Sequence, residues 1–529
     1  MWTLLLIAAT LISALIAPLS VAPAEAATET TSNWKTLTDM PTARGEFGVA
    51  VVAGKIYVIG GVNENNQPLG TVEEYNPLTD AWTNKMSMPT PRSGLAVAVY
   101  NNKIYAIGGS INGVFVGNNE VYDPVTNTWS TKSSMPTPRA DLSASVVNNE
   151  IFLIGGKKYS STSPFFVDTD VNECYFPEND TWSQKAAVPT SVLGYASAVL
   201  ENKIYIIGGS RRATSTDIVS IVNTNQVYDP RTDQWTQAAP LPITTNYGAA
   251  AATTGTYAPA GIYFIGGSTA QTVSAEVMMY HLSNNSWVKI ESMPTARGRL
   301  GVAVVSDVLY VIGGFDGTKW LKTNEQYKPV GYGTVAPIIT ITSPENKTYQ
   351  RVTLDFTLNR GAQWMGYSLD GQANVTVTGQ TRLSNLAQGG HHIVMFANDS
   401  AGNMGISNSV YFSIDTEGPV IVILNPANQS YDSTDILLEF TVSENATLAY
   451  SLDGQTALPI VGNLTLVALS NGGHRITIYA TDQLGNTTEE TVYFNIAPFP
   501  FLTVIAAITI AIIIGASGFI LIKRKKPDS

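Results

Sequence analysis

A unit of about fifty residues is repeated six times in this chain. Each copy contains a Gly-Gly pair, and the pairs are found at residues 60–61, 108–109, 155–156, 208–209, 266–267 and 313–314. A tyrosine follows every pair, and in five copies a tryptophan comes about seven residues after the tyrosine. These residues are Tyr75, Tyr122, Tyr175, Tyr228, Tyr280 and Tyr327, and Trp82, Trp129, Trp182, Trp235 and Trp287. Copies of this size must bury their apolar faces against one another.

Each copy is predicted to contain four short strands. In the second copy, residues 94–100 (GLAVAVY) and 103–107 (KIYAI) are separated by an Asn-Asn pair, which tolerates the positive φ angles of a hairpin turn. A third strand covers residues 120–123, and a fourth begins at Trp129. Four strands per copy, with pairs 47 to 58 residues apart, are typical of the blades of a β-propeller. We expect the repeated aromatic residues to pack between blades.

The two ends of the repeat region complement each other. The sixth copy ends at residues 327–329 without a fourth strand, whereas Trp34 and Met40-Pro41 match Trp287 and Met293-Pro294. We therefore predict that residues 34–41 complete the sixth blade and leave no open sheet edge.

On these motifs, residues 34 to 329 resemble the kelch-repeat family of six-bladed β-propellers. Two copies depart from the pattern: Val192 and Thr245 stand where the others have Arg44, Arg92, Arg139 and Arg297. The fifth copy also carries an insertion at residues 254–261. The resemblance implies a propeller fold but not one activity, because kelch propellers include copper oxidases, sugar-processing enzymes and, most often, protein-binding modules.

A second repeat follows, with a step of about 83 residues. Residues 337–344 (PIITITSP) match 419–426 (PVIVILNP), and YSLDGQ occurs at 367–372 and again at 450–455. Alternating strands with Asp-Gly and Gly-Gly turns over this length predict small β-sandwiches. The two units resemble prokaryotic immunoglobulin-like or fibronectin-type modules, and we expect them to form a stalk.

The two ends of the chain predict export and anchoring. Residues 1–26 have an apolar run followed by Ala24-Glu25-Ala26, as in a cleaved signal peptide, with a retained anchor as the alternative. Residues 499–522 lack charge, and a helix of that length would span about 36 Å, enough for a bilayer core. The following residues 523–526 (KRKK) indicate the cytoplasmic side.

The predicted fold class is therefore all-β, with a six-bladed kelch propeller, two tandem immunoglobulin-like sandwiches and one transmembrane helix. The expected organisation is a signal peptide (1–26), the propeller (27–333), module one (334–415), module two (416–497), a membrane helix (498–522) and a basic tail (523–529). We expect a single-pass cell-membrane protein with its N-terminal part outside, in an archaeal or other prokaryotic envelope.

Charge and cysteine content narrow the functions. Without the predicted signal, helix and tail, 26 basic and 39 acidic residues remain, a net charge of −13. A nucleic-acid partner is therefore not expected, since phosphate binding requires a basic surface. Cys174 is the one cysteine, so no disulfide can form within the chain, and we interpret it as a small buried apolar residue.

Nine asparagines lie in Asn-x-Ser/Thr sequons and are candidate glycosylation sites. They are Asn179, Asn284, Asn346, Asn374, Asn398, Asn428, Asn445, Asn463 and Asn486.

The sequence predicts no metal site, cofactor or catalytic residue. A copper oxidase would need several histidines near a Tyr-Cys pair, but the propeller region contains only His281 and Cys174. The adjacent His391 and His392 would point to opposite faces of a strand. One enzymatic alternative stays open, because Glu46, Asp141 and Asp168 could converge from different blades as the carboxylates of a hydrolase.

The leading interpretation is a surface-anchored recognition or adhesion protein whose propeller binds an extracellular protein or a glycan. A surface carbohydrate-active enzyme and a structural envelope component are the alternatives. The loops at 157–171 and 210–224 are the longest between second and third strands, on adjacent blades, and loops on a rigid scaffold are where recognition is usually built.

The candidate ligand-binding residues are aromatic residues and arginines, which are enriched among interface anchors. From the loops come Tyr159, Phe165, Phe166, Arg211, Arg212 and, in the sixth blade, Trp320. The Pro-Thr-x-Arg turns contribute Arg92, Arg139 and Arg297, which resemble positions that kelch proteins use for ligands but whose regularity equally suits a structural role.

Overall fold

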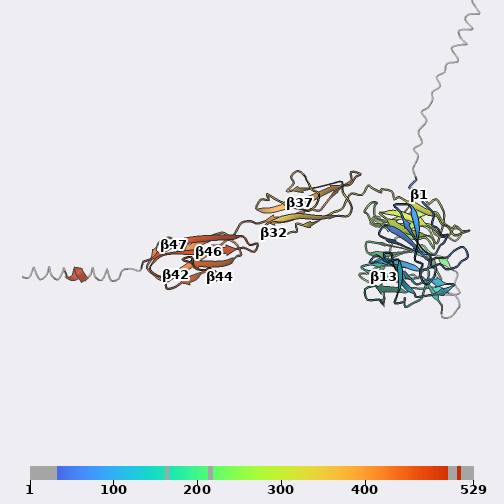
Figure 1. The fold of residues 1–529 in the computed structure, drawn as a ribbon, viewed down its shortest axis with the longest axis horizontal. Coiled ribbons are helices and arrows are strands. Elements are labelled where there is room, and N and C mark those ends of the chain that lie inside the picture. Colours follow the sequence, from blue (N-terminus) through green and yellow to red (C-terminus); the bar gives the residue numbers. More distant parts are fainter. Residues whose placement is uncertain (1–31, 161–165, 213–218, 498–508, 514–529) are drawn as a thin grey trace, which may run out of the picture. The chain divides into compact units, whose positions relative to one another are not determined.

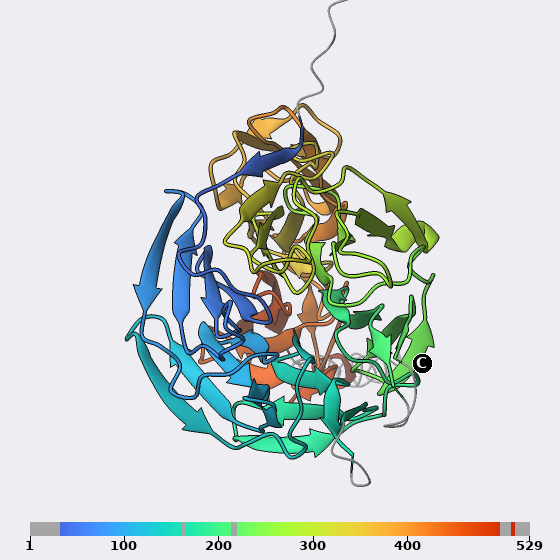
Figure 2. The ribbon, with the colours of Figure 1, turned by 90° about the vertical axis from the view of Figure 1, so that its right-hand side faces the viewer.

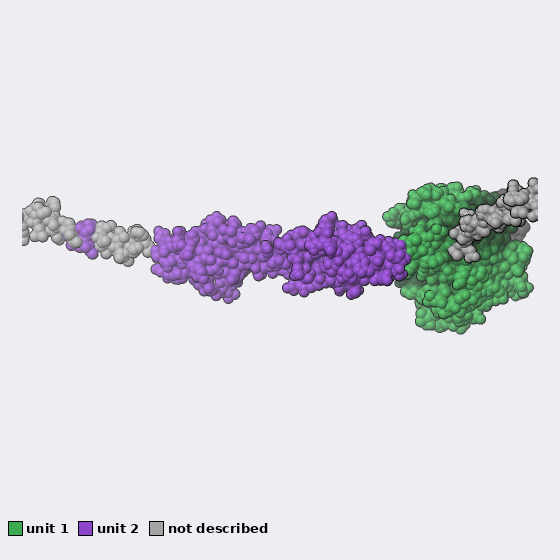
Figure 3. Space-filling model, turned by 90° about the horizontal axis from the view of Figure 1, so that it is seen from above, with its two compact units in different colours: residues 1–335 green, residues 336–529 purple. Residues whose placement is uncertain are grey.

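The computed structural model describes residues 32–160, 166–212, 219–497 and 509–513, and nearly all its regular structure is β-strand. The chain divides into two compact units, residues 1–335 and 336–529 (Figures 1 and 3).

The first unit contains six four-stranded antiparallel sheets around a common centre (Figure 2). Blade one consists of β2 (Gly48–Val52), β3 (Lys55–Ile59), β4 (Val72–Asn76) and β5 (Ala81–Lys85). Blade two consists of β6 (Ala96–Tyr100), β7 (Lys103–Ile107), β10 (Asn119–Asp123) and β11 (Thr128–Lys132). Blade three consists of β12 (Ser143–Val147), β13 (Glu150–Ile154), β16 (Asn172–Phe176) and β17 (Thr181–Gln184). Blade four consists of β18 (Ala196–Leu200), β19 (Lys203–Ile207), β22 (Asn225–Asp229) and β23 (Gln234–Gln237). Blade five consists of β24 (Ala249–Thr253), β25 (Gly261–Ile265), β26 (Val277–His281) and β27 (Ser286–Lys289). Blade six consists of β28 (Gly301–Val305), β29 (Val308–Ile312), β30 (Asn324–Tyr327) and β1 (Trp34–Thr36).

The repeated tryptophans join each blade to the one before it. In blade two, Trp129 lies opposite Tyr122 with ring centroids 5.2 Å apart, and its indole N–H donates to the carbonyl of Met86 in the preceding blade at 2.9 Å. Trp82, Trp182, Trp235 and Trp287 make the equivalent bond at 2.8–3.0 Å. The repeat therefore fixes both the packing within a blade and the contact between blades.

The N-terminal strand β1 is the outer strand of blade six. Trp34 lies opposite Tyr327 in the antiparallel register, with ring centroids 4.9 Å apart. Its indole N–H donates to the carbonyl of Glu291, at the end of blade five, at 3.2 Å. Trp34 thus makes the contact that the other five tryptophans make, and the ring closes between the two ends of the repeat region.

The second unit contains two β modules of two sheets each. In residues 337–415, β31 (Ile339–Ser343), β33 (Val352–Leu358) and β36 (Thr381–Leu383) form one sheet, and β32 (Thr348–Tyr349), β39 (Val410–Ile414), β37 (Gly389–Asn398), β34 (Trp364–Leu369), β35 (Val375–Thr376) and β38 (Met404–Ile406) form the other. In residues 419–497, β40 (Ile421–Asn425), β42 (Ile436–Val442) and β45 (Leu464–Leu466) form one sheet. The other sheet contains β41 (Ser430–Tyr431), β47 (Thr487–Ile496), β46 (Gly472–Thr481), β43 (Thr447–Leu452) and β44 (Leu458–Ile460). In each module, apolar residues of both sheets share one core.

The predicted signal peptide and basic tail lie outside the described residues. Of the predicted membrane helix, the structure describes residues 509–513, which are helical. No helix in the described part of the chain is long and apolar enough to cross a bilayer.

Candidate binding face of the propeller

A ring of six residues surrounds one end of the central channel. Each blade contributes one residue with a left-handed backbone, and their φ angles lie between 51° and 59°. They are Glu46, Gly94, Asp141, Gly194, Tyr247 and Arg299. The N–H of each residue donates to the carbonyl of another member in the neighbouring blade, at 2.5–3.2 Å, so the backbone bonds close a circle. Four members carry side chains, and left-handed backbone strain at such residues often marks a functional site.

The loops between second and third strands open on this same face. In every blade, an isolated antiparallel bridge joins the turn before the inner strand to that loop, as Gly45 pairs with Val62 and Ala140 with Lys157. We call this side of the propeller the mouth face.

Each charged side chain of the ring forms an ion pair. Arg299 forms an ion pair with Glu46 of the next blade and stacks over the ring of Tyr247 at 4.1 Å. The Tyr247 hydroxyl reaches across the ring and donates to Asp141 at 2.9 Å, and Asp141 also pairs with Lys157 at 2.6 Å. Burial, reinforced by the Asp141 charge, raises the pKa of Tyr247 well above its usual range, so the hydroxyl remains a donor. These contacts leave a small cavity of about 110 Å³.

Two of the three carboxylates that could serve a hydrolase meet at the mouth. Glu46 and Asp141 both line the cavity, but each is held in an ion pair. Asp168 is not among the residues that line this cavity. It accepts hydrogen bonds from the Ser191 hydroxyl and, at 2.8 Å, from the backbone N–H of Arg212. These contacts favour a structural role for Glu46 and Asp141 at the mouth over a role as the general acid and base of a hydrolase.

Three loops on the mouth face extend into two-stranded hairpins, one on each of blades two, three and four. They are β8 (Ser110–Ile111) with β9 (Val114–Phe115), β14 (Lys157–Tyr159) with β15 (Phe166–Asp168), and β20 (Ser210–Arg211) with β21 (Ser220–Ile221). The sequence predicted the second and third loops as binding loops.

Side chains of these loops form a continuous row of aromatic and cationic groups. Phe115 stacks on Tyr159 with ring centroids 4.5 Å apart, and the Lys157 ammonium lies 5.7 Å from the Phe115 ring and 5.0 Å from the Phe166 ring. The Arg212 guanidinium lies 5.1 Å over Phe166. We call these five residues the hairpin surface, because they link blades two, three and four.

The remaining candidates from the loops lie in different places. Arg211 is exposed at the end of β20, and Phe165 lies outside the described residues. Trp320 is on the mouth face but in a separate groove, between loops of blades six and one, that shares Glu46 and Arg299 with the mouth. Phe115, which the sequence analysis missed, had no signal beyond being an aromatic residue in a shorter loop.

The arginines of the Pro-Thr-x-Arg turns are buried, which argues against their candidate role in ligand binding. Arg92, Arg139 and Arg297 are fully enclosed, as is Arg44. Each forms an ion pair with a glutamate on the third strand of its own blade, at 2.6 Å for Arg297 and Glu325. Each also donates to a carbonyl of the second strand. They therefore tie the turn to two strands, and we leave them out of the binding surface.

Comparison of the six blades shows that the sequence could have indicated this pairing of arginine with glutamate. The two blades that lack the arginine also lack the glutamate: Gln226 accompanies Val192, and Met278 accompanies Thr245. Arginine and glutamate are thus present or absent together.

Seven of the nine candidate glycosylation sites are exposed: Asn179, Asn284, Asn346, Asn374, Asn428, Asn445 and Asn463. Asn398 and Asn486 are half-buried. The Asn486 amide nitrogen donates to Asp482 at 2.8 Å and its oxygen accepts from Gln350 at 2.7 Å, so this side chain is already occupied.

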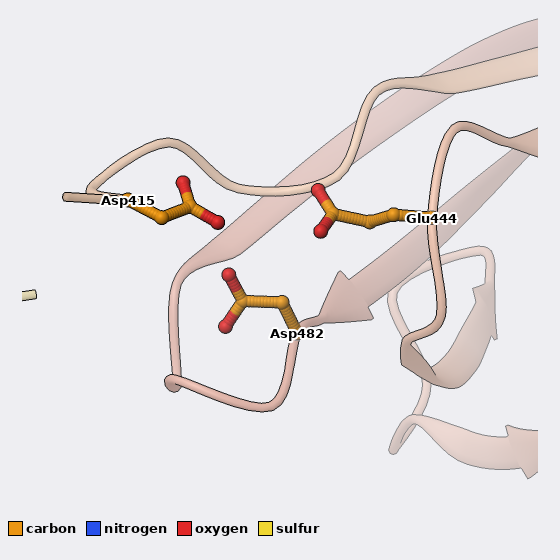
Figure 4. A group of neighbouring side chains, drawn as sticks. All are labelled: Asp415, Glu444 and Asp482. Carbon is orange, nitrogen blue, oxygen red and sulfur yellow. The ribbon is translucent and has the colours of Figure 1, made fainter. Parts of the chain in front are cut away.

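Within the described residues, one group of acidic side chains is compact enough to hold a metal ion (Figure 4). Asp415, Glu444 and Asp482 each bring an oxygen within 4.8 Å of the others. Asp482 already accepts from the N–H groups of Leu484 and Asn486 at 2.8 Å, which shapes its own turn. That local role accounts for its position.

The comparisons with known proteins agree with the ring of blades. The family model for the Attractin/LZTR1 beta-propeller matches residues 30–321. The chain belongs to this propeller family. Similar curated proteins are Kelch-like protein terF of Aspergillus terreus, 28% identical over 154 residues, and human Kelch-like protein 23, 30% identical over 142 residues. These matches cover 28% and 27% of this chain but only 33% and 24% of the relatives.

Among solved structures, one titled "Structure of YjhT" is 18% identical, with a TM-score of 0.46, and the match covers 54% of this chain and 96% of that one. Kelch-type propellers are generally protein-interaction domains, so the family supports binding as the general function of this unit.

Proposed function

We propose that this chain is a recognition protein displayed on the cell surface, whose propeller binds a protein or glycan partner through the mouth face. The second unit would serve as a stalk of two immunoglobulin-like modules, and residues 498–522 as the membrane anchor. The absence of charge from residues 499–522 and the basic cluster after them support the anchor.

The hairpin surface is the observation that carries this proposal. Aromatic rings bury a large contact area, and aromatic residues and arginines are enriched among the residues that contribute most of the binding energy of interfaces. Here Phe115, Tyr159, Phe166 and Arg212 are held by one another on hairpins that project from a rigid ring. Such a surface is organised before a partner arrives, which lowers the cost of binding.

The test is binding of the purified full chain to glycan and protein arrays of envelope components, with turnover of each bound compound also measured. Phe166→Ala and Arg212→Ala should each weaken binding at least tenfold without shifting the melting temperature. Leu78→Ala is the matched control, since Leu78 is an exposed apolar residue, 95% accessible, in a turn between third and fourth strands at the other end of a blade. Unchanged affinity in both hairpin variants would place the site elsewhere, and turnover would favour the enzyme.

A further inference from the structure

A groove of about 790 Å³ runs between a loop of blade one and a loop of blade six, beside the mouth. It is lined by Glu46 and Arg299 of the ring, by Glu64 and Asn66 of the blade-one loop, and by Lys319 and Trp320 of the blade-six loop. This volume is typical of a small-molecule site, and about seven times that of the mouth cavity.

The aromatic wall is fixed in place. The Trp320 indole lies so close to Gly45 that a β-carbon there would come within 2.3 Å of the ring, which explains the glycine. Trp320 also packs against Phe315, with ring centroids 5.0 Å apart, and its backbone pairs with Phe315 in an antiparallel bridge. The indole remains only partly buried.

Both loops are held by their own side chains. Asp316 accepts the N–H groups of Thr318 and Lys319 at 2.8 and 2.9 Å, and Asn63 accepts those of Asn65 and Gln67 at 3.0 Å. These side chain to backbone bonds define tight turns on the two sides of the groove. The groove is therefore formed without a ligand.

We propose that this groove is a binding site for a neutral saccharide. An aromatic ring offers a flat apolar surface for the C–H face of a sugar, and the polar groups around it provide both donors and acceptors for hydroxyl groups. The two carboxylates and two cations of the lining sum to zero, and one of each is already paired in Glu46 and Arg299. The lining as a whole therefore has no net charge that would favour a strongly anionic or a strongly cationic ligand.

This inference rests on the proposed function and narrows it, because it assigns a ligand class to one part of the mouth face. The groove has the dimensions of a site for a few sugar rings and not of a protein interface, which buries about 800 Å² on each partner. The hairpin surface lies on other blades, so the two sites can be tested separately.

The experiment titrates the full chain with neutral di- to tetrasaccharides of glucose, galactose, mannose and N-acetylglucosamine, and with sialylated and uronic-acid oligosaccharides, followed by calorimetry and by ligand-observed NMR. At least one neutral compound should bind and should lie against an aromatic ring. Trp320→Ala should weaken that binding at least tenfold, Trp320→Phe should restore part of it, and Glu64→Gln should weaken it without altering the melting temperature.

Leu78→Ala, in the exposed turn at the other end of blade one, is the matched control and should leave saccharide binding unchanged. Binding by none of the neutral saccharides, preference for the anionic ones, or equal affinity in the native chain and Trp320→Ala would each overturn the inference. If a partner binds through Phe166 and Arg212 while every saccharide fails, the inference is wrong and the proposed function stands.

Discussion

Two histidines in the second unit show how single residues are tuned by their partners. The Nδ1 of His391 lies 2.7 Å from Asp370 and its Nε2 lies 2.8 Å from the carbonyl of Ala387. His474 repeats the arrangement with Asp453 and Ser470, at 2.8 Å for both contacts. All four partners are acceptors, and only an imidazolium can donate from both nitrogens.

The pKa directions agree with this geometry. Burial works to lower the pKa of His391, but the Ala387 carbonyl and the Asp370 carboxylate outweigh it and raise the pKa above its usual value. The Ser470 carbonyl and Asp453 raise the pKa of His474 against the same effect of burial. His392 faces Asp370 as well, at 3.5 Å, and the Arg475 N–H donates to Asp453.

The second unit should therefore lose stability as the pH rises. A histidine whose pKa is higher in the folded than in the unfolded state contributes its full stabilisation below the unfolded pKa of about 6.5. This stabilisation is lost as the pH rises through the folded pKa. In calorimetry of the full chain from pH 5 to pH 9, the melting temperature of the second unit should fall as the pH rises above about 6.5. The double variant His391→Asn, His474→Asn should flatten this dependence; an equally steep slope in the variant would contradict the assignment.

Within each blade, the buried arginine and glutamate act as a unit that joins the turn to the sheet. The partners lie 28 to 34 residues apart in sequence, and burial lowers the pKa of all four arginines. Removing one partner leaves a buried unpaired charge, which is far more costly than removing both.

Blade four supplies a natural design for testing this pairing in blade two. Arg92→Val alone should lower the free energy of unfolding by roughly 3–5 kcal/mol, because Glu120 is left buried without its partner. Adding Glu120→Gln, which reproduces the Val192 and Gln226 combination, should recover at least about 1 kcal/mol. Urea unfolding of Arg92→Val, Glu120→Gln and the double variant measures both values and the coupling between the two residues. Losses that simply add would show that the two residues are not coupled.

The blades were predictable from sequence because the same residues recur wherever the same contact is made. The Gly-Gly, Tyr and Trp positions belong to the packing of every blade and so repeat. The ring at the mouth could not be found in this way, because its members, among them Glu46, Tyr247 and Arg299, share a backbone conformation and not a side chain. For Arg92 the sequence left a ligand-binding role and a structural role open, because its glutamate partner is on a distant strand and an arginine in a turn is usually solvated.

At the scale of the whole propeller, closure depends on the N-terminal strand. Among the residues that the structure describes, the buried Tyr327 hydroxyl has no hydrogen-bond partner, whereas the Tyr122 hydroxyl donates to Asn127 in the turn that follows it. Blade six lacks that turn because its outer strand comes from the other end of the repeat region. The binding face was predictable only as a set of loops, since which side chains meet across blades depends on the assembled ring.

Trp34→Ala should therefore be among the most destabilising single changes in the propeller. Truncating a buried tryptophan costs about 3–5 kcal/mol, and Trp34 is 8% exposed. Trp320→Ala, at the partly exposed wall of the groove, should lower the free energy of unfolding much less. Chemical unfolding of the two variants decides this, and equal losses, or none for Trp34→Ala, would contradict closure by β1.

The most direct test of the account is hydrogen–deuterium exchange of the full chain, alone and with a partner retained on the arrays. Binding through the mouth face predicts slower exchange in residues 110–115, 157–160 and 166–168 of the hairpins, or in residues 62–67 and 315–320 of the groove, while the turns at 76–81 and 123–128 exchange unchanged. Protection confined to those turns or to residues 336–497, with hairpins and groove unaffected, would contradict the central claim that the mouth face is the recognition surface.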